Sequence, residues 1–328
     1  MPLSPRHRGN RMNTMRHFHI TLGVLAAIGL ALSLAGCTTN VATGNSQLDY
    51  LSREDEIAIG QQAMPELIQQ YGGLVPDARL QDHVRRVGMR LAQHVEEPYR
   101  NMPWEFTFLD TNVINAFALP GGKVFMTRGL AERMTDESQL AGVLGHEIGH
   151  VTAEHADAAI GRQLGLQIGA GLLSVFAGAS ESAAVATAAD VLVQGAGVWV
   201  LQYDREQENE ADKLGMRYMA RAGYNPEGQL HVMEILKEAS GGQAPPEWLS
   251  THPAPQTRID IIRKRLQEPR WAALVEANRA SDNPRAFQRD FIEPLKRLPP
   301  PKDTGQGGLL AHPELWCAHC RAARESGT

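Results

Sequence analysis

The spacing of apolar residues changes along the chain, and these changes predict an α+β protein that is mainly α. Helical spacing follows Ser52, where acidic residues would occupy the first turn, and it returns over residues 78–95. From Asp136 onward the pattern is almost entirely helical. Three short segments have the alternating or bounded apolar pattern of strands, and we expect a small sheet from residues 104–109, 113–118 and 123–127.

A mostly apolar run covers residues 20–34 and follows a basic start. The first 36 residues contain four arginines and no acidic residue. A basic start, a short apolar run and small residues before a cut site are typical of a secretory signal. The run has fifteen residues, fewer than the roughly 20 that a membrane-spanning helix needs. We therefore expect residues 1–36 to be a signal peptide.

Cys37 follows a Leu-Ala-Gly sequence, an order that resembles a bacterial lipobox. On this interpretation Cys37 carries a lipid and begins the mature chain, and residues 37–50 form a polar linker that leaves the anchor. The alternative is an uncleaved anchor helix with an incidental cysteine. Both interpretations tether the protein outside the cytoplasm. Thr38, in place of an aspartate, favours the periplasmic face of the outer membrane over the inner membrane.

Two further stretches have an unusual composition. Residues 158–200 are rich in Gly, Ala, Leu and Val, but each apolar run within 164–200 is too short to span a bilayer. We expect a buried or membrane-skimming helical hairpin there. Beyond Leu298, a triple proline and a Gly-rich polar sequence predict a flexible tail over residues 299–328.

Composition and charge narrow the class of protein. The 328 residues are 43% hydrophobic and 21% charged, an ordinary balance for a globular protein and unlike a disordered chain. The formal net charge of −5 gives no electrostatic footprint for nucleic acid. Cys317 and Cys320 lie in the tail, where a local disulfide or an unstructured segment is the simplest interpretation. A redox pair, or a small metal site with His312 and His319, is the alternative.

A helix capped by Thr135 or Asp136 contains His146, Glu147 and His150 in the order His-Glu-Ile-Gly-His. Histidines four residues apart share one helix face, so both rings can reach one ion. Zinc accepts imidazole nitrogen readily, and a catalytic site needs three protein ligands and an open position for water. Glu147 lies beside the histidine pair and is placed to accept a proton from that water.

A third ligand should come from a second element, and three glutamates of one helical segment compete for this role: Glu206, Glu208 and Glu210. Helical geometry places Glu208 and Asp212 on the small, apolar face, and the other two glutamates on the opposite, solvated face. A buried acid is costly unless it binds a cation or a partner, so Glu208 is the preferred zinc ligand. Asp212, one turn later, is placed to hold the distal nitrogen of a ligating histidine. The alternative is a helix whose acids pair with Arg205, Lys213 and Arg217.

Together these motifs resemble metallopeptidase family M48, which includes HtpX and the CAAX prenyl protease. The matching segments follow the order of the family along most of the mature chain, at residues 43–60, 115–122, 146–150, 208–212 and 251–259. The periplasmic lipoprotein branch fits best, because convincing membrane spans are absent. The resemblance implies a gluzincin-like zinc-peptidase domain over residues 51–268, with a small sheet next to the active-site helix. A helical extension over residues 269–298 would follow.

The resemblance also suggests roles for residues outside the zinc motif. It assigns an edge strand beside the active-site helix to Asn115, Ala116, Phe117 and Ala118. Such a strand can pair with an extended substrate backbone, and the alternative is a hairpin that only completes the sheet. His252 is a candidate regulatory or oxyanion-stabilising residue, with a purely structural role as the alternative. Continuing the helix of His146 places His155 on the opposite side, and we expect it to face solvent.

We therefore expect a membrane-tethered, zinc-dependent endopeptidase with one Zn²⁺ per chain. The resemblance implies that its substrates are misfolded or unassembled envelope polypeptides. A lipoprotein chaperone or assembly factor with a latent zinc site is the main alternative. Redox activity through the two tail cysteines is a third hypothesis.

Overall fold

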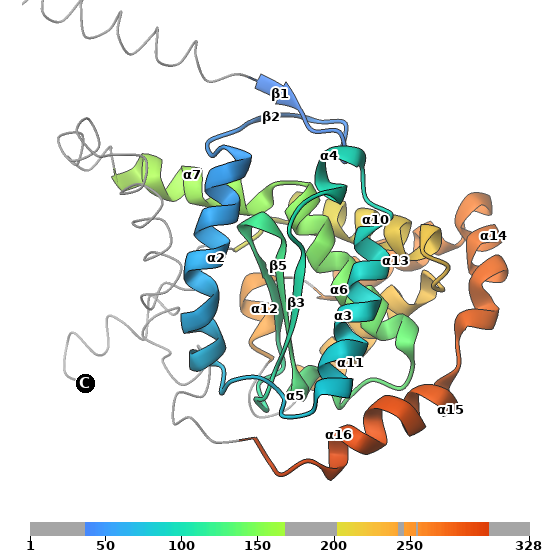
Figure 1. Ribbon diagram of the computed structural model, residues 1–328. Helices are drawn as coiled ribbons and strands as arrows, with labels where there is room; N and C mark the ends of the chain where they lie inside the picture. The colour runs from blue at the N-terminus through green and yellow to red at the C-terminus, as the bar shows by residue number, and fades with distance from the viewer. Residues whose placement is uncertain (1–36, 168–201, 242–245, 254, 302–328) are drawn as a thin grey trace, which may run out of the picture.

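The computed structural model describes residues 37–167, 202–241, 246–253 and 255–301, and helices surround a small sheet (Figure 1). The expected class, α+β and mainly α, is confirmed. None of the helices in these ranges is long and apolar enough to cross a bilayer. The expected signal peptide, most of the apolar stretch 164–200 and the cysteine-containing tail lie outside the described residues.

A two-stranded hairpin forms where we expected a polar linker. Strands β1 (Cys37–Thr39) and β2 (Ser46–Leu48) pair antiparallel. Asn40 fixes the turn, because its side-chain oxygen accepts hydrogen bonds from two backbone amides of the turn. The amide nitrogen of Asn40 donates to the carbonyl of Thr152, 3.0 Å away, so the hairpin is attached to the central helix α6. Polar bonds within the turn and to α6, together with the buried Ala42, therefore order this segment.

The two helices expected before the sheet are confirmed. Helix α2 (Arg53–Gln70) begins after Ser52, which forms a capping box with Asp55. Helix α3 (Ala78–Ala92) begins after Asp77, whose carboxylate accepts two backbone hydrogen bonds. Its apolar stripe packs onto the sheet and onto α6.

The main sheet has the order β3–β5–β4, with bounds β3 (Glu105–Leu109), β4 (Ala116–Leu119) and β5 (Lys123–Thr127). Strands β3 and β5 run parallel, and β4 runs antiparallel to β5 at the edge of the sheet. The expected strand over residues 113–118 begins later, at Ala116. The hydroxyl of Thr127 accepts the hydrogen bond from the backbone amide of Asn115, so the regular ladder starts one residue further on.

Successive side chains of a strand point to opposite faces of the sheet, and they contribute to two separate apolar clusters. Phe117 and Leu119 of β4 face α2, while Ala116 and Ala118 face the larger cluster around α6. Short alanine side chains at the edge allow the helix to approach the strand closely. The sheet therefore lies between α2 on one face and α3 with α6 on the other (Figure 1).

The remaining helices have the bounds α4 (Glu97–Arg100), α5 (Arg128–Ala131), α6 (Glu137–Thr152), α7 (His155–Gln167), α10 (Arg205–Arg221), α11 (Glu227–Ala239), α12 (Trp248–Thr251), α13 (Pro255–Leu266), α14 (Pro269–Asn278), α15 (Pro284–Phe287) and α16 (Glu293–Arg297). Among these helices, α10 and α11 pack most closely on α6. Short 3₁₀ turns lie at η1 (Pro120–Gly122) and η4 (Arg279–Ser281), and a π-helical turn, η5 (Gln288–Ile292), joins α15 to α16.

Residues after α13 return to the same core. Phe287, Phe291 and Leu295 are buried in the cluster that contains α3 and α6. Arg128 fastens this end of the chain, because its guanidinium donates to the carbonyls of Leu295 and Leu298. The helical extension thus shares its apolar core with the preceding helices.

Candidate metal centre

Helix α6 brings His146 and His150 together. Asp136 caps the helix, as one of the two expected caps, and the four-residue spacing puts both rings on one face. Their Nε2 atoms lie 3.0 Å apart, and each side chain is almost fully buried. Burial lowers the pKa of His146 to about 4 and that of His150 well below its usual value, so both rings are neutral. Neutral imidazole is the form that binds a metal ion.

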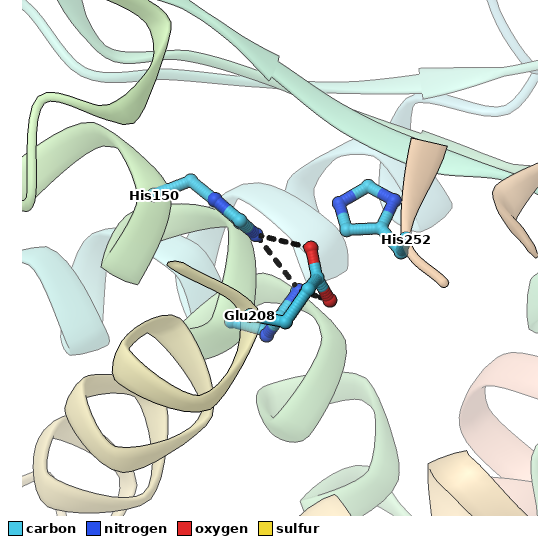
Figure 2. A group of neighbouring side chains, drawn as sticks. His150, Glu208 and His252 are labelled. Carbon is cyan, nitrogen blue, oxygen red and sulfur yellow. Dashed lines mark hydrogen bonds and ion pairs between the residues drawn. The ribbon is translucent and has the colours of Figure 1, made fainter. Parts of the chain in front are cut away.

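Glu208 reaches the same point from α10. One carboxylate oxygen lies 3.4 Å from Nε2 of His150, and the other lies 3.6 Å from Nε2 of His146. Figure 2 shows His150, Glu208 and His252 converging from three different elements. Glu208 is fully buried, which raises its pKa well above the usual range. Such an acid is stable in this position only beside a cation.

A close contact between α6 and α10 makes this geometry accessible. A Cβ atom added to Gly149 would lie 2.7 Å from the carbonyl oxygen of Ala211, and one added to Gly215 would lie 2.8 Å from the backbone of His146. Any larger residue would therefore hold the two helices apart. The glycines bring the backbones close enough for the short Glu208 side chain to span the gap.

The spacing of the donor atoms fits a tetrahedral metal ion. With zinc–nitrogen bonds of about 2.0–2.1 Å, tetrahedral geometry separates two ligand atoms by roughly 3.3–3.4 Å. The two Nε2 atoms lie 3.0 Å apart, and the two oxygens of Glu208 lie 3.4 Å from Nε2 of His150 and 3.6 Å from Nε2 of His146, respectively. Oε1 of Glu208 accepts no hydrogen bond within the described residues and retains lone pairs that a cation can use, while Oε2 contacts the guanidinium of Arg258. These residues therefore fit a zinc ion.

Asp212 lies one turn after Glu208, with a carboxylate oxygen 3.0 Å from Nδ1 of His146. Gln229 and Arg258 donate hydrogen bonds to the same carboxylate, over 2.9 and 2.8 Å respectively. Burial alone would raise the pKa of Asp212, but the charge of Arg258 and the hydrogen bonds from Arg258 and His146 hold it below the usual range. A permanent carboxylate therefore fixes the orientation of the His146 ring.

Glu147 points into the same buried space and is 1% exposed. Burial raises its pKa to about 8, although a hydrogen bond from Trp248 and the charge of Arg258 act in the opposite direction. Nε2 of His252 lies 3.7 Å from one oxygen of the Glu147 carboxyl group. The carboxyl group thus lies in an environment that favours proton uptake near neutral pH.

His252 joins the group from the end of α12. The closest donor atoms of His146, His150, Glu208 and His252 all lie within 4.8 Å of one another. Nδ1 of His252 contacts the hydroxyl of Thr251 at 2.7 Å, and its Nε2 makes no hydrogen bond within the described part of the chain. The ring stacks on Trp248 with centroids 4.4 Å apart, and Arg258 covers the Trp248 ring at 4.7 Å. His252 is therefore held with a free nitrogen facing the centre.

The predicted edge strand lies beside this group. Asn115 and the next three residues are buried, and β4 pairs with β5 on one side only. Ala118 and His150 line a shared cavity with Tyr203. That cavity offers only about 10 Å³, roughly the space of one water molecule. The described side chains therefore leave little space between His150 and the edge strand.

His155 contradicts the expectation that it faces solvent. It is 4% exposed, and its Nδ1 lies 2.9 Å from Nδ1 of His150. The extrapolation failed because α6 ends at Thr152 and Glu154 adopts a left-handed conformation, with φ of 56°. Helix α7 then starts in a new direction and carries His155 back toward the centre. Neither glycine nor proline marks this break in the sequence.

Arg258 is the second functional candidate whose role the sequence reasoning missed, although it lies in the matching segment 251–259. The alternative interpretation paired the acids of α10 with basic residues on the same helix. Instead, the guanidinium of Arg258 on α13 contacts both Glu208 and Asp212. The sequence indicated that Glu208 and Asp212 need a cation beside them. It did not identify Arg258 as that cation, because Arg258 lies 46 residues from Asp212.

Two histidines and two glutamates on a pair of closely packed helices define a buried centre of the metallopeptidase class. The chain belongs to Peptidase family M48, whose sequence profile matches residues 78–266. The resemblance found in the sequence motifs is therefore confirmed.

Two bacterial relatives and one mitochondrial relative share this region. The chain is 33% identical over 202 residues to the beta-barrel assembly-enhancing protease of Escherichia coli (strain K12), covering 60% of this chain and 41% of that protein. It is 30% identical over 263 residues to the protein of the same name from Yersinia pestis, with coverage of 78% and 50%. The mitochondrial metalloendopeptidase OMA1 of Arabidopsis thaliana is 32% identical over 160 residues, with coverage of 48% and 31%. The chain thus spans half or less of the length of these relatives.

Proposed function

We propose that the protein is a zinc-dependent endopeptidase with one Zn²⁺ held by His146, His150 and Glu208. The observation that carries this proposal is the convergence of three buried donor groups at separations that fit tetrahedral zinc. Zinc supplies a Lewis acid that polarises a peptide carbonyl and makes water more acidic. Asp212 holds the His146 ring through its distal nitrogen.

Glu147 is the general base and acid of the proposed reaction. Its carboxylate takes a proton from the attacking water and later delivers that proton to the leaving amine. The raised pKa of about 8 supports the second step, because a buried carboxyl retains a proton long enough to transfer it. A cation at the neighbouring ligands would lower this pKa and so favour the first step.

The edge strand β4 supports a preference for unfolded polypeptides. Alternate residues of an antiparallel ladder exchange hydrogen bonds with the partner strand, and the bond from Thr127 to the carbonyl of Asn115 sets this alternation. The backbone groups of Ala116 and Ala118 therefore point to the edge of β4 that faces away from β5. An extended segment can add to that edge as a further strand, whereas a folded domain cannot. Two relatives are named for enhancing β-barrel assembly. We propose misfolded or unassembled envelope polypeptides as substrates, with protein quality control as the role.

The proposed location is the cell envelope, on the periplasmic face of the outer membrane. Residues 1–36 would act as a signal peptide and Cys37 would carry the lipid anchor. The peptidase domain would cover residues 51–268, with the helical extension 269–298 and the cysteine-containing tail 299–328 after it. The hairpin β1–β2 follows Cys37 directly, so the anchor would lie beside the folded domain.

The burial of all the candidate ligands favours a regulated or latent site as the second candidate function. His252 and Trp248 are at most 2% exposed and stack on each other beside the centre, and we propose that α12 moves when a peptide enters. His252 would then act as a regulatory residue, or would stabilise the oxyanion once displaced. A lipoprotein chaperone or assembly factor with a latent zinc site remains the alternative to constitutive proteolysis.

The proposal is tested by zinc content together with cleavage of an unfolded reporter, with and without a chelator. We expect about one zinc per chain and cleavage that stops on zinc removal. Glu208→Ala should lose zinc by elemental analysis, whereas the exposed Glu206→Ala on the same helix should retain it. Unchanged zinc in Glu208→Ala would refute the ligand assignment. Full complementation in cells by a proteolytically inactive Glu147→Gln form would favour the chaperone alternative.

A further inference from the structure

We propose that His155 and Glu210 hold the His150 ring in the tautomer that binds a metal ion, and that Asn45 of the hairpin completes this chain of contacts. The inference deepens the proposed function and rests on it, because it assumes that His150 is a metal ligand. His155, Glu210 and Asn45 would be positioning residues that act through His150.

A continuous series of polar contacts leads away from the centre. Nδ1 of His150 lies 2.9 Å from Nδ1 of His155, and Nε2 of His155 lies 3.2 Å from a carboxylate oxygen of Glu210. The other oxygen of Glu210 accepts a hydrogen bond from Asn45 over 2.7 Å. The series thus joins α6, α7, α10 and the turn of the β1–β2 hairpin.

With Glu210 ionised and His155 neutral, the chemistry of these groups sets the direction of each hydrogen bond. An ionised glutamate can only accept, so Nε2 of His155 carries the hydrogen that points to Glu210. Nδ1 of a neutral His155 is then an acceptor, and Nδ1 of His150 must be the donor. The Nε2 lone pair of His150 is therefore left free. That nitrogen is the one that faces His146 and Glu208.

Burial makes these contacts hard to replace with water. His155 is 4% exposed, and the ring of Tyr203 stacks on His150 with centroids 3.8 Å apart and an interplanar angle of 21°. The stacked ring restricts rotation of His150, and the hydrogen bond sets which nitrogen points to the centre. Without His155, the Nδ1 hydrogen of His150 would have no partner at this position.

The hairpin also stabilises the chain reversal that places His155. Glu154, the residue with the left-handed conformation, accepts hydrogen bonds from Arg53 over 2.7 Å and from Tyr99 over 3.1 Å. Gln47 of β2 donates to its other oxygen. Two hairpin side chains therefore contact the residues that orient His150. This arrangement couples the segment after Cys37 to the metal centre.

The zinc affinity of the full chain tests this inference, measured by competition with a chromophoric chelator. Loss of a partner that orients a ligating histidine typically lowers metal affinity about 10- to 100-fold, and we expect that loss for His155→Ala. Glu210→Ala should also weaken zinc binding. Glu210→Gln should recover most of the affinity, since its amide oxygen can still accept from His155. Asn45→Ala should give the smallest loss.

Matched controls separate positioning from general damage. Glu206→Ala removes an exposed acid from the same helix, and His231→Ala removes an exposed histidine from α11; both should bind zinc as the wild type does. The thermal midpoint of the zinc-free variants should stay close to that of the wild type. The visible absorption of the Co²⁺-substituted protein should change in His155→Ala. If that variant does not fold, the Glu210→Ala and Glu210→Gln pair supplies the same comparison.

The failure of this inference differs from the failure of the proposed function. If the wild type binds zinc and both His155→Ala and Glu210→Ala bind it equally tightly, only the positioning role is refuted. If the wild type binds no zinc, the proposed function is refuted and this inference with it.

Discussion

Replacing Gly149 with alanine tests how the contact between α6 and α10 builds the metal centre. The added Cβ would lie 2.7 Å from the carbonyl oxygen of Ala211 and 3.0 Å from its Cα atom. Ordinary contact begins at 3.4 Å, so α10 must move away by up to 0.7 Å, the difference between 3.4 and 2.7 Å. Both atoms belong to the backbone, and no side-chain rotation can relieve the overlap.

The expected cost follows from two opposing effects. Overpacking costs about 1–3 kcal/mol, whereas replacing glycine by alanine within a helix gains about 0.5–1 kcal/mol. We therefore expect a net loss of stability by chemical denaturation of the zinc-free protein. Zinc binding should weaken further, since metal sites tolerate deviations of only about 0.2 Å in ligand distance.

Two other glycines provide a graded control. In Gly145→Ala the nearest atom, the carbonyl oxygen of Gly215, would be 3.2 Å away, and the effect on both measurements should be smaller. In Gly241→Ala the nearest atom would be 3.4 Å away, so the stability and the zinc affinity should both match those of the wild type. A Gly149→Ala protein with wild-type stability and zinc affinity would refute the role assigned to this helix contact.

Three further predictions concern charged groups around the centre. Arg258→Met removes the cation beside Glu208 and Asp212, and breaking such a buried pair typically costs about 3–5 kcal/mol. The substitution should therefore lower the thermal stability of the zinc-free protein more than that of the zinc-loaded protein, where the metal supplies positive charge. Equal losses of stability in the two forms would contradict this reasoning. Burial raises the pKa of Glu56 to about 8 despite the nearby Arg53, so the folded protein holds a proton that the unfolded chain releases above its usual value of 4.5. Stability should fall as pH rises from 4.5 to 8, and Glu56→Gln should flatten this slope in denaturation at several pH values; an unchanged slope would exclude Glu56 as its origin. His252→Ala should raise the cleavage rate of an unfolded reporter at equal zinc content if His252 keeps the centre closed, whereas a lower rate would favour its oxyanion role.

The parts of the molecule that follow local rules could be predicted from the sequence. Ser52 and Asp136 cap helices, and alternation defines the strands, because these signals depend on neighbouring residues only. The inward face of α10 was also predictable, since helical periodicity distinguishes Glu208 from Glu206.

The parts that depend on long-range packing could not be predicted. His155 is buried because Glu154 reverses the chain in a conformation stabilised by Arg53 and Tyr99, which are distant in sequence. Arg258 reaches the centre from α13, and no local pattern links it to Asp212. His155 and Arg258 form no motif of their own, and only their contacts with His150, Glu208 and Asp212 reveal a role.

The central claim is that zinc held by α6 and α10 works with Glu147 to cleave peptide bonds. It is tested most directly by cleavage of an unfolded reporter by the wild type and Glu147→Gln at equal zinc content. We expect both proteins to bind about one zinc per chain and only the wild type to cleave. Equal cleavage by the two proteins would contradict the proposed role of Glu147 and the mechanism built on it.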